Sequence, residues 1–300
     1  MDTTLNLALV GYGQFGKKYF RNIKNNKKLF LKKIFRKKKS KNKKFSELSK
    51  RNLFNSHIDA AIICTPVKTH YKIAKFFIEQ KIPIILEKPA AQNFSQIKKL
   101  NNLSKKKLVS VIINHSDLFN QNLNNIFSRI KSIGKIKYIE AKYGKYSNKY
   151  KDKSLLPCYD WLPHPIAVII KLFKKVTFNK IIKNELKIRN KSFFQDLIIE
   201  LKAQKNINIK IHYSNRYKKK IRNLRLYGDK GFINYDGNDY KNSFIFIKKR
   251  INLKKPSKTP LENILSKLRF SVNKKRYFSD LKLALEIEKI QSEIRKKIII

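Results

Sequence analysis

A glycine-rich turn between a buried strand and a helix constrains this chain more than any other feature of its sequence. The apolar run at residues 5–10 predicts a buried strand, residues 17–23 predict a helix, and the pattern G-x-G-x-x-G fills residues 11–16. A glycine motif alone is compatible with a flexible turn, but between a strand and a helix it favours a dinucleotide site whose phosphates meet the helix N-terminus. The residues of this predicted cofactor loop are Gly11, Gly13, Gln14, Phe15 and Gly16.

Apolar runs alternate with helical segments through the first 115 residues. Strands are expected at 29–35, 58–64, 82–87 and 108–114, with helices at 69–80 and 94–106. Asn93 is a candidate N-cap for the second of these helices. This alternation is typical of βαβ units and a parallel, doubly wound sheet. Residues 1–115 are therefore predicted to form a dinucleotide-binding Rossmann domain.

The pattern changes beyond residue 115. Strand-like stretches dominate from 177 to 248, preceded by a helix at 118–133, a strand at 136–143 and a helix at 166–173, and followed by helices at 260–270 and 279–296. Such a mixture predicts an α+β domain on a mainly antiparallel sheet over residues 116–300.

The end of the second predicted strand bears on cofactor choice. An NAD site usually has an acidic residue about 20 residues after the glycine motif, where it binds the ribose 2′-hydroxyl. Here Arg36 and Ser40 occupy that region, and arginine suits a 2′-phosphate. NADP is therefore favoured over NAD, although any position in so basic a chain has a high chance of being lysine or arginine.

The charge of the chain is extreme, with 71 Lys and Arg against 20 Asp and Glu and a formal net charge of +51. Clustered cations favour nucleic acid, and residues 32–44 are the densest run. Lysine is spread over every segment, however, together with much Asn, Ile, Phe and Tyr. These residues share A- and T-rich codons, so a genomic base bias is the alternative explanation, although it does not account for the scarcity of Glu. No nucleic-acid-binding motif accompanies the charge, so no specific nucleic-acid partner is expected.

No apolar stretch reaches the roughly 18 residues that span a bilayer. Residues 1–4 carry no basic segment, and residues 5–10 are too short for a signal sequence. We therefore expect a cytoplasmic protein without membrane contact. Cys64 and Cys158 are far apart and have no metal-ligand spacing, so no metal site is expected.

Three side chains are candidates for catalysis. Lys88 follows the apolar run 82–86, and in open α/β sheets ligands bind at the carboxyl ends of strands. His164 stands between two prolines at the expected start of a helix, and its ordinary pKa near neutrality suits proton transfer. Asp160 lies just before it, where helix capping is the alternative role. The residues expected to line the cofactor cleft beside them are Thr65, Pro66, His70, Glu87 and Lys88.

These features together resemble one protein family. The segments 11–16, 59–66 with His70, and 87–89 look like the successive motifs of the Gfo/Idh/MocA oxidoreductases. The resemblance continues in Ile133–Ile136, in Tyr159–His164, which matches the family's D-x-x-x-H, and in Arg225–Gly231. It covers most of the chain.

The resemblance implies hydride transfer between a nicotinamide cofactor and a hydroxyl or ketone of a sugar, cyclitol or sugar nucleotide. It implies a catalytic set of Lys88, Asp160 and His164, a substrate-binding and dimerisation role for residues 116–300, and a homodimer or homotetramer. Pro165 departs from the family, in which an acidic residue often follows the histidine. A non-catalytic protein that senses dinucleotide or sugar is therefore the alternative, and a nucleic-acid-associated basic protein is a more distant one.

Overall fold

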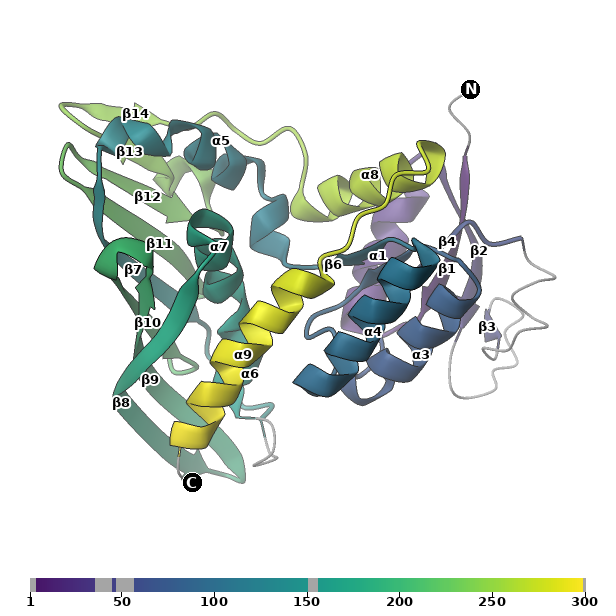
Figure 1. Ribbon diagram of the computed structural model, residues 1–300, viewed down its shortest axis with the longest axis horizontal. Helices are drawn as coiled ribbons and strands as arrows, with labels where there is room; N and C mark the ends of the chain where they lie inside the picture. The colour runs from purple at the N-terminus through teal and green to yellow at the C-terminus, as the bar shows by residue number, and fades with distance from the viewer. Residues whose placement is uncertain (1–3, 36–44, 47–56, 151–155, 299–300) are drawn as a thin grey trace. The chain divides into compact units, whose positions relative to one another are not determined.

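The computed structural model describes residues 4–35, 45–46, 57–150 and 156–298 of the chain (Figure 1). Two compact units account for them. One is formed by Met1–His115 with Leu261–Leu285, and the other by Ser116–Pro260 with Glu286–Ile300. Arg36 and Ser40, on which the predicted NADP preference depends, lie outside the described residues.

A parallel sheet forms the centre of the first unit. Among the described residues it has six strands in the order β3-β2-β1-β4-β5-β6, and every adjacent pair is parallel. The strands are β1 (Leu5–Val10), β2 (Leu29–Phe35), β3 (Phe45–Ser46), β4 (Ala60–Ile63), β5 (Ile84–Leu86) and β6 (Val111–Ile113). The order reverses between β1 and β4, which is the switch point where such sheets bind ligands. The predicted doubly wound parallel sheet is confirmed.

Helices follow the strands of this sheet as βαβ units require. They are α1 (Gln14–Lys24), α3 (Val67–Glu79) and α4 (Phe94–Lys107). The Asn93 side chain accepts a hydrogen bond of 3.0 Å from the backbone N–H of Gln96, so Asn93 caps α4 as predicted. Apolar side chains of the strands and of the inner helix faces are buried together and form the core of the unit.

The first unit also contains a segment from near the end of the chain. It comprises most of α8 (Pro260–Asn273) and the first residues of α9 (Leu281–Lys297). The backbone N–H of Val111 donates to the carbonyl of Phe278 at 2.9 Å, and the N–H of Ile113 donates to Asp280 Oδ2 at 3.1 Å. The late segment thereby pairs the outer edge of β6, a polar edge that would otherwise remain open.

The second unit is built on a larger sheet. Among the described residues it has eight strands in the order β14-β13-β12-β11-β7-β10-β9-β8, and only the β7–β10 pair is parallel. The strands are β7 (Ile136–Gly144), β8 (Val176–Arg189), β9 (Ser192–Ala203), β10 (Ile207–Ser214), β11 (Ile221–Gly228), β12 (Phe232–Asp236), β13 (Phe244–Phe246) and β14 (Arg250–Asn252). The predicted mainly antiparallel sheet is confirmed.

The helices of the second unit are α5 (Gln121–Arg129), α6 (Pro157–Trp161), α7 (Pro163–Phe173) and the part of α9 from Glu286 onwards. The prediction of a single helix over 118–133 is wrong, because this segment contains α5 between two 3-10 turns, Ser116–Phe119 and Ile130–Ile133. The physical reason is Asn120, whose side chain accepts a hydrogen bond of 3.0 Å from the N–H of Asn122 and starts a new helix there.

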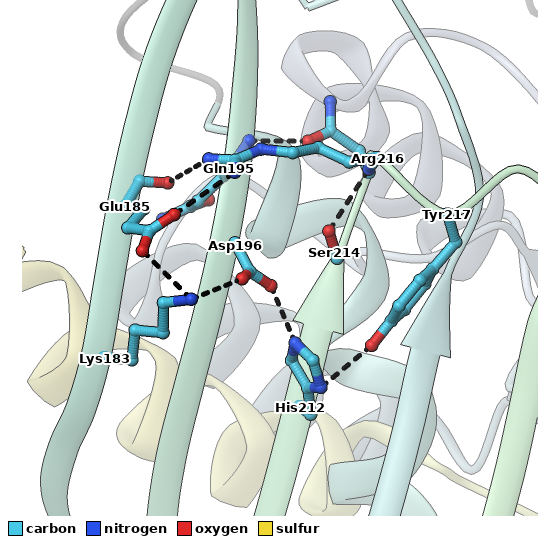
Figure 2. A network of polar contacts seen from close by, with 9 residues as sticks. Lys183, Glu185, Gln195, Asp196, His212, Ser214, Arg216 and Tyr217 are labelled. Carbon is cyan, nitrogen blue, oxygen red and sulfur yellow. Dashed lines mark hydrogen bonds and ion pairs between the residues drawn. The ribbon is translucent and has the colours of Figure 1, made fainter.

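Strands β8, β9 and β10 carry polar contacts on one face and apolar side chains on the other (Figure 2). On the polar face Asp196 bonds to Lys183 Nζ at 2.9 Å and to His212 Nε2 at 2.6 Å. Tyr217 Oη lies 2.9 Å from the other ring nitrogen of His212, and Arg216 pairs with Glu185 at 3.2 Å. Alternation of this kind is typical of an antiparallel sheet with one face in the core.

In the described part of the chain, every helix is too short or too polar to cross a membrane.

Candidate active site

Two glycines of the loop after β1 are required by the backbone. Gly11 has φ +94°, in the left-handed region, and a Cβ there would lie 2.8 Å from the carbonyl oxygen of Cys64. A Cβ on Gly16 would lie 2.3 Å from the carbonyl oxygen of Gly11. Gly11 thus makes the turn, and Gly16 lets the first turn of α1 approach the loop.

Gly13 is different, because nothing in its described surroundings excludes a side chain. Apart from Gly13 itself and its two neighbours in the chain, no described heavy atom lies within 4 Å of a Cβ built on Gly13. Gly13 is also the N-cap of α1, and among the described residues no side chain caps this helix and none in its first turn is acidic. The first N–H groups of a helix need partners, and a phosphate is a good one. This open helix N-terminus, which includes Gln14 and Phe15, fits a dinucleotide pyrophosphate.

His70 connects the segments that follow β4 and β5. Its Nδ1 lies 2.8 Å from the carbonyl oxygen of Pro89, and its Nε2 lies 2.7 Å from that of Thr65. Burial lowers the pKa of His70, whereas the two carbonyl oxygens favour its charged form. The ring therefore holds Thr65–Pro66 beside the segment of Lys88. Each ring nitrogen therefore faces a backbone carbonyl oxygen, and the role of His70 in shaping the cofactor cleft stays a prediction.

Glu87 and Lys88 follow β5, and Lys88 is half-buried. The side chain of Asn114 donates a hydrogen bond of 2.7 Å to Glu87 Oε1. Burial raises the pKa of Glu87 above its ordinary value, although the contacts with Asn114, Lys88 and Tyr19 act in the opposite direction. A buried carboxylate thus supports the backbone immediately before the candidate catalytic lysine.

We expect Glu87→Gln to stabilise the protein at neutral pH. The raised pKa means that the folded state binds the proton of Glu87 more tightly, so wild-type stability falls as the pH rises from about 4.5 through the folded-state pKa. The glutamine amide has no charge to desolvate and its oxygen can still accept from Asn114. The difference is measured by urea unfolding at about pH 5 and about pH 8, both within the range in which most proteins are stable.

The exposed Glu79→Gln in α3 removes the same charge and is the control. Its stability should stay within about 0.5 kcal/mol of the wild type at both pH values. Equal behaviour of the two variants would contradict the assignment of the raised pKa to Glu87.

His164 lies at the start of α7 in the second unit and is buried. Its Nε2 is 3.1 Å from Arg222 Nη2 on β11, and its Nδ1 is 3.3 Å from Asp117 Oδ2 in the 3-10 turn 116–119. The Tyr235 hydroxyl donates to the other Asp117 oxygen at 3.1 Å. Burial by itself would raise the pKa of Asp117, but the charge of Arg222 and the contact with His164 hold it well below its usual range.

Asp160 lies in the short helix α6, just before α7. Its Oδ2 accepts hydrogen bonds from Lys149 Nζ at 2.9 Å and from the Tyr150 hydroxyl at 2.8 Å. The structure thus brings His164 together with Asp117 and Arg222, and it gives Asp160 these other partners. Sequence reasoning missed Asp117 and Arg222, because neither is part of a local motif.

Lys88 belongs to the first unit, and His164 and Asp160 belong to the second. Among the described residues, no group of three or more His, Cys, Asp and Glu side chains could hold a metal ion.

Comparison with known proteins agrees with this description. Residues 5–115 match the family model GFO_IDH_MocA, described as oxidoreductase family, NAD-binding Rossmann fold. No curated protein matches the chain.

Solved structures share the whole fold at low identity. A UDP-N-acetylglucosamine 3-dehydrogenase from Acidithiobacillus ferrooxidans is 13% identical, with a TM-score of 0.80 and 98% of each chain covered. A dehydrogenase from Clostridium difficile is 15% identical, with a TM-score of 0.78, 98% of this chain and 99% of that chain. Biliverdin reductase from Synechocystis, in complex with biliverdin and NADP+, is 16% identical, with a TM-score of 0.73, 97% of this chain and 98% of that chain. At such identities the likeness concerns the fold alone. Residues 5–115, by contrast, match the family directly, and they belong to the NAD-binding Rossmann domain of the Gfo/Idh/MocA oxidoreductases.

Proposed function

We propose that this protein is an NAD(P)-dependent oxidoreductase that acts on a hydroxyl or ketone of a sugar, cyclitol or sugar nucleotide. The observation that carries the proposal is found within the first unit. An open, uncapped helix N-terminus at Gly13 and a lysine after β5 lie at the carboxyl end of one parallel sheet. A nucleotide sugar dehydrogenase is among the proteins of the same fold, which supports this substrate class.

The loop 11–16 would hold the pyrophosphate, and Thr65, Pro66 and His70 would form the neighbouring wall of the cleft. When bound, a nicotinamide dinucleotide supplies the hydride acceptor or donor. Lys88 would donate a hydrogen bond to the substrate oxygen and stabilise negative charge that develops there. His164 would accept the hydroxyl proton during oxidation, or return it during reduction. Asp160 would bind a substrate hydroxyl, or assist His164.

NADP is the proposed cofactor in preference to NAD. Arg36 and Ser40 carry this proposal from the sequence, and a protein of the same fold has been solved as an NADP+ complex. We further propose a homodimer or homotetramer in the cytoplasm, by likeness to the family.

One observation favours a second candidate, a protein that senses dinucleotide or sugar without turnover. Arg222 Nη2 lies 3.1 Å from Nε2 of His164, the nitrogen to which a substrate hydroxyl would pass its proton. Turnover with any member of a panel of sugars, cyclitols and nucleotide sugars would exclude this candidate. Retained dinucleotide binding without turnover would support it.

Titration with NADPH and NADH, followed by nicotinamide fluorescence, tests the proposed function. We expect both to bind, and NADPH to bind more tightly because Arg36 offers a charge to the 2′-phosphate. Tighter binding of NADH would remove the argument from Arg36. Absence of binding to either would sink the oxidoreductase proposal. The titration is run at two salt concentrations, because non-specific attraction to a +51 chain weakens with salt.

A further inference from the structure

The environment of His164 determines where its proton lies. A guanidinium group has N–H donors and no acceptor. Arg222 Nη2 lies 3.1 Å from Nε2 of His164, so Nε2 must be the acceptor and carries no proton. The proton of the neutral imidazole is therefore on Nδ1, the nitrogen that lies 3.3 Å from Asp117 Oδ2.

The contact with Arg222 disfavours the charged form of His164, whereas the Asp117 carboxylate favours it. An imidazolium would direct a second N–H at the guanidinium of Arg222, and two donors cannot share this contact. Arg222 is itself held, because its Nη1 donates to Ser116 Oγ at 2.9 Å and lies 3.6 Å from Asp117 Oδ1. Its guanidinium carbon also lies 5.8 Å from the centre of the Trp161 ring. Nη2 is thus positioned over Nε2 by three neighbours.

The charges around this group can be named element by element. Asp117 comes from the 3-10 turn, and Arg222 from β11. Tyr143 on β7 and Tyr235 on β12 are buried, and burial raises their pKa values well above the ordinary one, so both are neutral near pH 7. The negative charge of Asp236 on β12 also raises the pKa of Tyr143. Asp117 and Arg222 are therefore two charged groups in direct contact with the imidazole.

We propose that Asp117 and Arg222 are positioning residues that hold His164 as the neutral tautomer protonated on Nδ1. In the free protein the lone pair of Nε2 accepts a hydrogen bond from Arg222 Nη2, and a substrate hydroxyl takes the place of Nη2 when substrate binds. The proposal rests on the role proposed above for His164. It adds that a substrate must displace Arg222 before the hydroxyl proton can pass to Nε2. Substrate binding is then coupled to the release of His164 Nε2 as a proton acceptor, because the substrate hydroxyl and Arg222 compete for the same nitrogen.

The test is ¹⁵N NMR of the five histidine rings in the full-length protein, with His164 assigned by its loss in His164→Gln. Nitrogen shifts and long-range proton couplings distinguish the two neutral tautomers. We expect the neutral form of wild-type His164 to carry its proton on Nδ1. A proton found on Nε2 in the neutral wild type would overturn the proposal without any variant.

Two variants should move the titration of His164 in opposite directions. Arg222→Gln removes the cation but keeps an amide donor, and should raise the pKa of His164 by about one unit or more. Asp117→Asn removes the carboxylate but keeps an acceptor, and should lower it. If Asp117→Asn does not fold, Arg222→Gln and the wild-type tautomer still decide the question.

Arg225→Gln is the matched control. It removes the same charge from the same strand. Arg225, however, donates hydrogen bonds to Asn234 and Tyr227, and it lies three residues from Arg222, so its side chain is on the opposite face of β11. It should leave the His164 signals unchanged. If Arg222→Gln leaves them equally unchanged, Arg222 does not position His164. The NMR measurement needs neither dinucleotide nor substrate, so its failure is distinct from a failure of the dinucleotide titration.

Discussion

Gly13→Asp is expected to abolish dinucleotide binding without loss of stability. The backbone at Gly13 is extended, with φ −79° and ψ −160°, so an aspartate fits without strain. Its Cβ would have no described heavy atom within 4 Å other than those of its own residue and its two chain neighbours. Aspartate is also a preferred N-cap, and it would accept hydrogen bonds from the first N–H groups of α1. Those are the donors that the pyrophosphate needs, and the added carboxylate repels it.

We expect the dissociation constant for NADPH to rise by about a hundredfold or more, which corresponds to roughly 3 kcal/mol of lost hydrogen bonding and added repulsion. The new cap should at the same time stabilise α1 by about 1 kcal/mol. Fluorescence titration and urea unfolding of the same preparation measure the two effects. Weaker NADPH binding together with a higher free energy of unfolding would distinguish this effect from a general loss of structure.

Gly16→Ala provides the contrast within the same loop. Its Cβ would meet the carbonyl oxygen of Gly11 at 2.3 Å, so backbone must shift and stability should fall together with binding. Gly13→Asp that binds NADPH like the wild type would show that the loop is not the dinucleotide site. Loss of stability in Gly13→Asp would contradict the open environment of this glycine.

The parts of the fold that sequence predicted well are those whose signals are local. The bounds of β1 and β2, Leu5–Val10 and Leu29–Phe35, agree with the predicted strands. For β1 the reason is that a buried parallel strand reads as a nearly continuous apolar run. The glycine spacing locates the turn between β1 and α1, since Gly11 and Gly16 each have a steric cause within the loop or in the neighbouring strand end. A helix cap such as Asn93 is likewise a relation between residues three apart.

The parts that sequence did not predict depend on contacts between distant segments. Asp117 and Arg222 meet His164 only because a 3-10 turn, strand β11 and helix α7 come together in the second unit. Arg222 is one of 71 basic residues, so its identity carries little information by itself. The segment 276–280 pairs with Val111 of β6 through backbone groups, which any sequence possesses. Such relations have no period or spacing along the chain by which they could be recognised.

Replacing Lys88 with methionine is expected to remove turnover while leaving dinucleotide binding intact. Methionine keeps the length and apolar stem of the side chain but has no N–H donor and no charge. If Lys88 donates to the substrate oxygen, the variant loses stabilisation of the charge that develops there. Loss of one such donor costs about a hundredfold to a thousandfold in kcat. A panel of sugars, cyclitols and nucleotide sugars with NADP+ identifies a substrate for the wild type, and nicotinamide absorbance follows turnover.

Lys98→Met is the matched control, because Lys98 is exposed on α4 in the same unit and the substitution removes the same charge. It should keep wild-type turnover, which separates the role of Lys88 from the general attraction of a +51 chain for an anionic substrate. Intact turnover in Lys88→Met would exclude Lys88 as the group that polarises the substrate. Loss of NADPH binding in the same variant would instead assign Lys88 to the cofactor. The two measurements together therefore decide which partner this lysine, placed by β5 and supported by Glu87, contacts.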